Sequence, residues 1–224
     1  MKQRVVRAEQ IVLPDSDWGS RNMRGTPIAR VLAFVISAVA WIGIVINLAV
    51  VSEGIGNPLR AAWALLGYFT ILTNLIIGIA FGIIALRGPG AVNARVLGGI
   101  TISIMLVGVV FALLLSRTTD LTGATTITNI LHHRVTPVLV PVFWLLFVRK
   151  GALKWRDPLI WALYPIGYLA YALVRGTLEG RFAYGFIDYV SNGVSSVAVT
   201  ALLITAAFLL TSYLLVLLDK KLSK

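Results

Sequence analysis

The sequence predicts an all-α integral membrane protein, a six-helix bundle with both termini in the cytoplasm. Hydrophobic residues make up 58% of the 224-residue chain and charged residues only 13%, whereas soluble domains have roughly 45–50% and 25%. The apolar residues are gathered in six long runs, and a helix needs about 20 such residues to cross a bilayer. This composition excludes a soluble globular enzyme and also a disordered chain.

Each run supplies one predicted span. Charged residues bound the first three runs, the fourth carries two histidines, an arginine and two prolines, the fifth is short, and the sixth is long enough to tilt. The predicted spans are 31–52, 61–86, 96–116, 129–148, 158–174 and 190–218. Residues 1–27 are expected to form a polar cytoplasmic tail, and residues 28–224 a single membrane domain.

The distribution of Lys and Arg predicts the orientation. Fifteen of them fall in the N-terminal tail, the second–third loop, the fourth–fifth loop and the C-terminus, against four in the loops on the other side. Basic residues concentrate on the cytoplasmic side of membrane proteins, so both termini are expected there. This topology accounts for the net charge of +11 without a nucleic-acid partner.

The composition also limits the chemistry. The chain has no cysteine, which excludes disulfides, thiolate metal sites and cysteine nucleophiles. No carboxylate lies inside a predicted span, so a buried aspartyl pair is excluded too. No metal or cofactor is expected, and the remaining catalytic groups are hydroxyls and histidine.

Polar residues within the spans fall mainly in the outer half of the membrane, and the third span adds little to them. Polar side chains in spans usually face protein or water, so we expect a pocket that opens outward or sideways to the outer leaflet. The residues concerned are Thr70, Thr73 and Asn74 in the second span, Asn129, His132, His133 and Thr136 in the fourth, Tyr164, Tyr168, Tyr171 and Arg175 in the fifth, and Asp188, Asn192, Ser195, Ser196 and Thr200 near the sixth.

Histidine within a span favours a functional reading, because it titrates near neutral pH. The two neighbours His132 and His133 point to different faces, so at most one should be catalytic. A hydroxyl such as Thr70 can act as a nucleophile if an imidazole takes its proton. Asn129 could orient the imidazole or donate to an oxyanion, and Arg175 could hold a headgroup or a fatty-acid carboxylate.

Simpler interpretations exist for several of these residues. Hydroxyls in spans often bond to their own backbone or to a neighbouring helix, which is the expected role of Ser195, Ser196 and Thr200. The tyrosine stripe is equally well explained as a packed helix face. Arg134 can extend to the outer headgroups.

Short motifs resemble those of the androgen-induced protein family, which includes the androgen-dependent regulators of tissue factor pathway inhibitor. The segment 68–74, YFTILTN, resembles the family's first signature, and 131–137, LHHRVTP, resembles its second, a histidine followed five positions later by proline. Tyr164-Pro165, residues 171–176 and Phe186-Ile187-Asp188 resemble the bacterial branch. The resemblance covers roughly residues 30–221 and implies a bacterial inner-membrane location.

The resemblance implies an intramembrane hydrolase of fatty acid esters of hydroxy fatty acids, with Thr70 as nucleophile and His132 as base. Thr73 is a rival nucleophile, because this chain has one more residue between Thr70 and Asn74 than the animal members of the family. The expected partner is a membrane lipid or fatty acyl ester. Two alternatives stay open: a transporter or channel, and a non-catalytic lipid-binding protein. The lack of a matching polar path in the inner half of the spans argues against a transporter or channel. The sequence does not indicate the oligomeric state.

Overall fold

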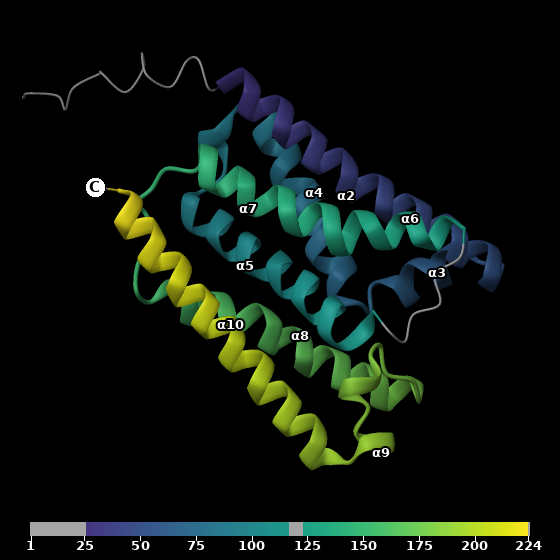
Figure 1. The fold of residues 1–224 in the computed structure, drawn as a ribbon. Coiled ribbons are helices and arrows are strands. Elements are labelled where there is room, and N and C mark those ends of the chain that lie inside the picture. Colours follow the sequence, from purple (N-terminus) through teal and green to yellow (C-terminus); the bar gives the residue numbers. More distant parts are fainter. Residues whose placement is uncertain (1–25, 117–122, 224) are drawn as a thin grey trace, which may run out of the picture.

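The computed structural model describes residues 26–116 and 123–223, so most of the predicted polar tail lies outside the described residues. Within them, six helical units are long and apolar enough to cross a membrane and no strand occurs (Figure 1). The units are α2 (Thr26–Ile55), α4 (Phe69–Arg87), α5 (Ala94–Val110) with η2 (Phe111–Leu115), α6 (Ala124–Ile130) with η3 (Leu131–Val135) and α7 (Thr136–Phe147), α8 (Asp157–Glu179), and α10 (Val194–Leu222). Shorter elements are α3 (Pro58–Leu65), η1 (Pro89–Ala91), η4 (Gly185–Ile187) and α9 (Tyr189–Asn192). The predicted all-α, six-helix membrane class is confirmed.

Helices α4 and α5 lie at the centre of the bundle. Helix α2 packs along α4 and also contacts α3, α6 and α7, while α5 contacts α4, α7, α8 and α10. The core between these helices is apolar, with Ile36, Ile77 and Phe81 at most 1% exposed. The rings of Phe81 and Phe143 meet edge to face at 5.0 Å, a favourable aromatic geometry.

One end of the bundle gathers the helix ends that the charge distribution assigns to the cytoplasm. The Arg30 guanidinium donates to the carbonyls of Ala85 and Leu86 at 2.8 and 2.9 Å, which ties the start of α2 to the end of α4. The Leu153 N–H donates to the Asp219 carboxylate at 2.9 Å, near the C-terminus at the same end (Figure 1).

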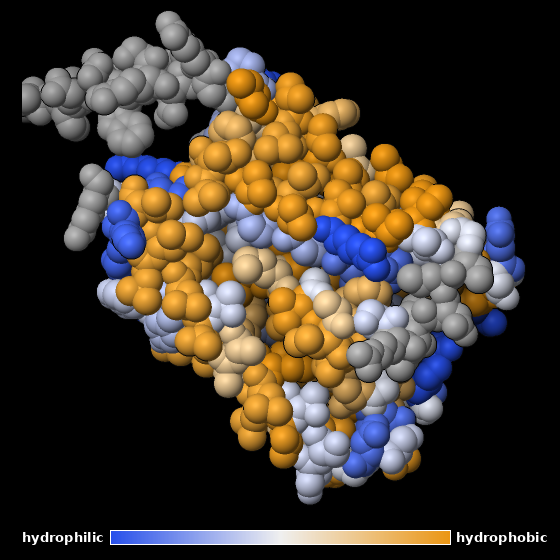
Figure 2. All heavy atoms as spheres, viewed as in Figure 1, coloured by the Kyte–Doolittle hydropathy of each residue, from blue (hydrophilic) through white to orange (hydrophobic). Residues whose placement is uncertain are grey.

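The outer surface of the bundle is hydrophobic. Figure 2 shows apolar residues covering the outward faces of α2 and α10, with hydrophilic residues gathered toward the two ends. Phe34 on α2 is 65% exposed and Leu202 on α10 is 69% exposed. A large exposed apolar surface is typical of a protein face that contacts another apolar surface. In this helix bundle we expect that contact to be with lipid acyl chains.

The second predicted span, 61–86, is interrupted. Helix α3 ends at Leu65 and α4 begins at Phe69, with Tyr68 in an extended conformation between them. The carbonyls of Leu66 and Gly67 accept hydrogen bonds from the hydroxyls of Tyr171 and Tyr168 on α8, at 3.3 and 2.8 Å. These tyrosines satisfy backbone groups that a helix break leaves free.

Two π-helical turns, η2 and η3, interrupt the third and fourth spans. Such turns insert an extra residue and often occur at functional sites. In the fourth span, Pro137 has no N–H to bond the carbonyl one turn earlier, and it packs against Gly108 of α5, where a methyl group would lie 3.0 Å from Pro137 Cβ.

The sixth predicted span, 190–218, is also divided. Gly193 adopts φ +79° between α9 and α10, a conformation that favours glycine. The membrane-spanning part is therefore α10 alone, and it runs four residues beyond the predicted end.

Candidate active site at the start of helix α4

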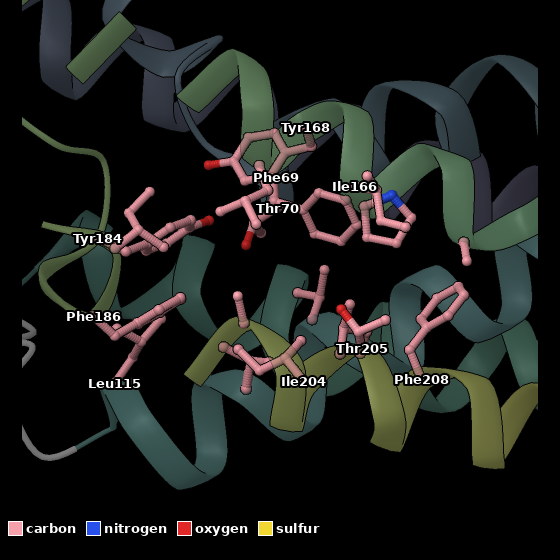
Figure 3. Close-up of a pocket in the computed structure, with 18 residues that line it drawn as sticks. Phe69, Thr70, Leu115, Ile166, Tyr168, Tyr184, Phe186, Ile204, Thr205 and Phe208 are labelled. Carbon is pink, nitrogen blue, oxygen red and sulfur yellow. The ribbon is translucent and has the colours of Figure 1, made fainter. Parts of the chain in front are cut away.

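Thr70 is the second residue of α4, directly after the helix break. Its side chain is 8% exposed and lines a cavity between α4, α5, α8 and α10 (Figure 3). The break places this hydroxyl at a helix N-terminus, where the first N–H groups have no partner inside the helix. The sequence predicted a mid-helix position instead.

The imidazole beside Thr70 belongs to His133. Thr70 Oγ1 lies 3.3 Å from His133 Nε2, at the long end of hydrogen-bond distances. The predicted contact between Thr70 and His132 is therefore wrong, although a threonine of the second span does meet a histidine of the fourth. The π-helical turn η3 contains both histidines, and its extra residue changes which of them faces α4.

His132 faces α2 instead. It is 1% exposed, and its Nε2 lies 3.2 Å from the Ala40 carbonyl oxygen. A methyl group on Gly43 would collide with the ring, so glycine is required where α2 passes the imidazole. These contacts indicate that His132 holds the fourth span against α2.

The surroundings of His133 fix its ring. Phe111 of η2 stacks on the imidazole, with ring centroids 4.2 Å apart and an interplanar angle of 24°. The second ring nitrogen, Nδ1, is buried and has no hydrogen-bond partner. A proton on Nδ1 would leave Nε2 free to accept from Thr70.

Tyr184 completes the arrangement around Thr70. It comes from the segment between α8 and α10, and its hydroxyl interacts with the Thr70 side chain and with the backbone of Phe69 and Thr70. Figure 3 shows the Tyr184 and Thr70 side chains directed toward each other. Burial raises the pKa of Tyr184, so its hydroxyl stays protonated at neutral pH and can donate a hydrogen bond.

The cavity beside Thr70 is mostly apolar, with a volume of about 100 Å³. Its far wall consists of α10 residues that include Ile204, Thr205 and Phe208 (Figure 3). On the α8 side Ile166 also lines the cavity and is 47% exposed. The cavity therefore reaches the lipid-facing surface between α8 and α10, as an apolar chain entering sideways requires.

The other predicted residues of α4 and α6 lie near Thr70 in supporting positions. The Asn74 amide donates to the Thr70 carbonyl at 2.9 Å, within the helix. Thr73 Oγ1 is hydrogen-bonded to the Tyr164 hydroxyl at 3.1 Å, on the side of α8. The side-chain oxygens of Asn74 and Asn129 are buried without a hydrogen-bond partner, so either could accept from a bound molecule or water.

The tyrosine stripe of α8 supports the site from behind. Tyr168 lines the cavity and bonds to Gly67, and Tyr171 bonds to Leu66. Arg175 lies further out: it donates to the Tyr171 hydroxyl at 2.9 Å and to Glu179 at 2.8 Å. Its guanidinium also lies 4.3 Å from the Trp63 ring centroid. Arg175 thus has protein partners and does not line the Thr70 cavity.

Asn192 does not contribute to the site. It is exposed, and its amide donates to the carbonyls of Gly185 and Asp188 at 2.8 and 2.9 Å, which orders the turn before α10. Arg134 is also exposed, in keeping with a side chain that reaches the headgroups.

Three residues of the site were not predicted from the sequence: Tyr184, Phe111 and the backbone N–H of Phe69. Tyr184 lies just before the motif 186–188 and outside every predicted span, and Phe111 lies in an apolar run without a distinguishing pattern. Within residues 26–116 and 123–223, no group of three or more His, Asp or Glu side chains could hold a metal ion.

A scan against protein-family models found no match for this chain, and neither did searches of curated proteins and of solved structures. The resemblance to the androgen-induced protein family therefore rests on the short motifs alone.

Proposed function

We propose that this protein is an intramembrane hydrolase of lipid esters, with Thr70 as nucleophile and His133 as general base. The observation that carries the proposal is the 3.3 Å approach of Thr70 Oγ1 to His133 Nε2 at the wall of an apolar cavity. A nucleophile and a base within hydrogen-bond reach, with the base held by further contacts, is the arrangement that covalent hydrolysis needs.

In the first half of the reaction, Thr70 Oγ1 attacks the ester carbonyl carbon and its proton passes to His133 Nε2. The tetrahedral intermediate then collapses, the carbon–oxygen bond to the alcohol breaks, and the leaving alkoxide takes the proton from His133. In the second half, His133 takes a proton from water, whose oxygen attacks the acyl-threonine. The acid is released and Thr70 Oγ1 regains a proton.

The start of α4 offers donors for the oxyanion. The N–H groups of Phe69 and Thr70 have no partner inside the helix and interact with the Tyr184 hydroxyl. The Tyr184 side chain is directed toward Thr70 (Figure 3), so an oxyanion beside Thr70 would lie near these free backbone donors and near the Tyr184 hydroxyl. A substrate carbonyl would displace this hydroxyl or accept its hydrogen bond.

The cavity favours a substrate with an apolar chain beside its ester. A fatty acyl ester could enter between α8 and α10 from the lipid, with its chain along Ile166 and Phe208 and its carbonyl at Thr70. Fatty acid esters of hydroxy fatty acids, which the family resemblance implies, are one such class.

The test is hydrolysis of a long-chain fatty acyl ester by the purified protein in detergent micelles. We expect Thr70→Ala and His133→Ala to lower kcat by at least about 10²-fold, because general acid–base catalysis contributes about 10²- to 10⁴-fold. Thr73→Ala is the matched control on the same helix. Full turnover in Thr70→Ala would overturn the proposal.

Transport is the second candidate function, and one observation favours it. The lining of a groove in the half predicted to be cytoplasmic includes Ser103, Arg95 and Asp157, which would offer polar contacts to a solute there. Solute flux in proteoliposomes that persists in Thr70→Ala would favour transport over hydrolysis.

A further inference from the structure

A second cavity, separate from the one beside Thr70, lies between α4, α5 and α8. Its volume is about 530 Å³, and it extends from Asn93 and Arg95 to Thr73 and Tyr164. Along α5, eight residues separate Arg95 from Ser103, or about 12 Å of depth at 1.5 Å per residue. We call it the inner groove, because it opens in the half of the bundle predicted to be cytoplasmic.

The sides of the inner groove are apolar and open to the lipid. Val96 is 53% exposed, Ile160 is 50% exposed and Ile76 is 39% exposed, and all three line the groove within membrane-spanning helices. An apolar groove open at the side of a membrane protein will take up an apolar chain rather than water.

The end of the inner groove near the membrane surface is positively charged. Asp157 is 1% exposed, and its carboxylate is fully engaged with the Arg95 guanidinium and the Lys154 N–H. The Arg95 side chain keeps 31% of its surface exposed. Lys154 and Arg156, beside Asp157 in the chain, are exposed. Because Asp157 offsets the charge of Arg95, these two residues give the start of α8 a net positive charge.

The Arg95–Asp157 pair is built into the fold. The Arg95 N–H donates to Asn93 at 2.8 Å, and the Trp161 indole donates to the Arg95 carbonyl at 3.0 Å. The same indole ring packs on Gly98 and Gly99, where a methyl group would lie 2.8 and 2.7 Å from it. The guanidinium is therefore held at the groove mouth, where its remaining N–H groups can bind a phosphate oxygen.

We infer that the inner groove binds a phospholipid of the cytoplasmic leaflet with an acidic headgroup. The phosphate lies at Arg95, with Lys154 and Arg156 around the headgroup, and one acyl chain runs past Val96 and Ile160 toward Ser103. Charge complementarity favours an acidic over a zwitterionic headgroup, because basic pockets at the cytoplasmic side of spans select anionic lipids. This site is independent of the hydrolase proposal.

Native mass spectrometry of the purified full chain tests the inference, with phosphatidylglycerol and phosphatidylcholine added separately. We expect one phosphatidylglycerol per chain to be retained, and phosphatidylcholine at least about tenfold less, the scale of one charge-assisted hydrogen bond. Equal retention of the two lipids would show that the site does not select an acidic lipid and would overturn the inference.

Two variants locate the binding. Val96→Trp, at an exposed position, should fill the groove and lower phosphatidylglycerol retention at least about tenfold, whereas Leu202→Trp, at an exposed position of α10 outside the groove, should leave it unchanged. The double variant Arg95→Gln/Asp157→Asn removes the guanidinium together with its partner carboxylate and should lower the preference for phosphatidylglycerol, because only Lys154 and Arg156 would remain near the headgroup. Unchanged retention in Val96→Trp, or an unchanged preference in the double variant, overturns the assignment.

Discussion

The two adjacent histidines have different surroundings and should have different roles. His132 is enclosed by Gly43 and the Ala40 carbonyl of α2, whereas His133 meets Thr70 of α4 and stacks on Phe111. The first set of contacts joins two spans, and the second joins a base to a hydroxyl. Substitutions at the two positions should therefore separate stability from catalysis.

His132→Ala should lower stability, because it leaves a cavity against α2. Large-to-small substitutions in a core cost about 2–5 kcal/mol, and the loss can be measured as a lower unfolding temperature in detergent. His133→Ala should fold with little change but lose ester hydrolysis. Loss of hydrolysis in His132→Ala with an unchanged unfolding temperature would reverse these assignments.

Gly43→Ala tests the packing of His132 from the other side. The added methyl group would collide with the imidazole, and overpacking of a core costs typically about 1–3 kcal/mol. We expect a lower unfolding temperature, with recovery in the double variant Gly43→Ala/His132→Ala. Wild-type stability in the single variant would contradict the close approach of α2.

The sequence predicted that a threonine of the second span meets a histidine of the fourth, but not which histidine. Regular helical spacing separates neighbouring residues by about 100°, so either could face α4. The π-helical turn decides between them, and directly after it Pro137 packs against Gly108, 29 positions earlier in the chain. No local pattern around 131–135 contains that information.

At the scale of elements, the break between α3 and α4 creates the site, since it converts a mid-span threonine into a residue at a helix N-terminus. The apolar run 61–86 has the length of one helix, so its composition predicts no break. The break is stabilised by tyrosines of α8 about a hundred positions later in the chain. The spacing of the tyrosines indicates a stripe on one helix face, but nothing in the sequence indicates that the carbonyls of Leu66 and Gly67 accept their hydrogen bonds.

Tyr168→Phe should weaken this break. It removes the 2.8 Å hydrogen bond to the Gly67 carbonyl, and a buried acceptor left without its partner costs about 1–3 kcal/mol. We expect a lower unfolding temperature together with a lower kcat, because Thr70 follows three residues after Gly67. Tyr213→Phe on α10 is the control, and equal behaviour of the two variants would argue against this role of Tyr168.

At the scale of the whole molecule, composition and the length of the apolar runs were sufficient to predict the fold class and the approximate location of the six spans. These properties depend on the bilayer rather than on particular contacts. The observed ends of several spans differ from the prediction by a few residues, because caps and turns at the membrane surface set them. The orientation rests on the distribution of basic residues.

Labelling of single cysteines tests this orientation directly, because the chain has none of its own. Arg60 lies in the first turn of α3, at the end of the bundle predicted to be outside, and Lys154 lies at the opposite end; both are exposed. A maleimide that cannot cross membranes should label Arg60→Cys in intact cells and Lys154→Cys only after permeabilisation. The reverse pattern would invert the topology.

The most direct measurement of the central claim is to map the acyl adduct formed with an activated fatty acyl ester, by mass spectrometry of the peptides. The account predicts an acyl group on Thr70 in the wild type and in Thr73→Ala, and none in Thr70→Ala or His133→Ala. An adduct on Thr73, or undiminished ester turnover in Thr70→Ala, would contradict it.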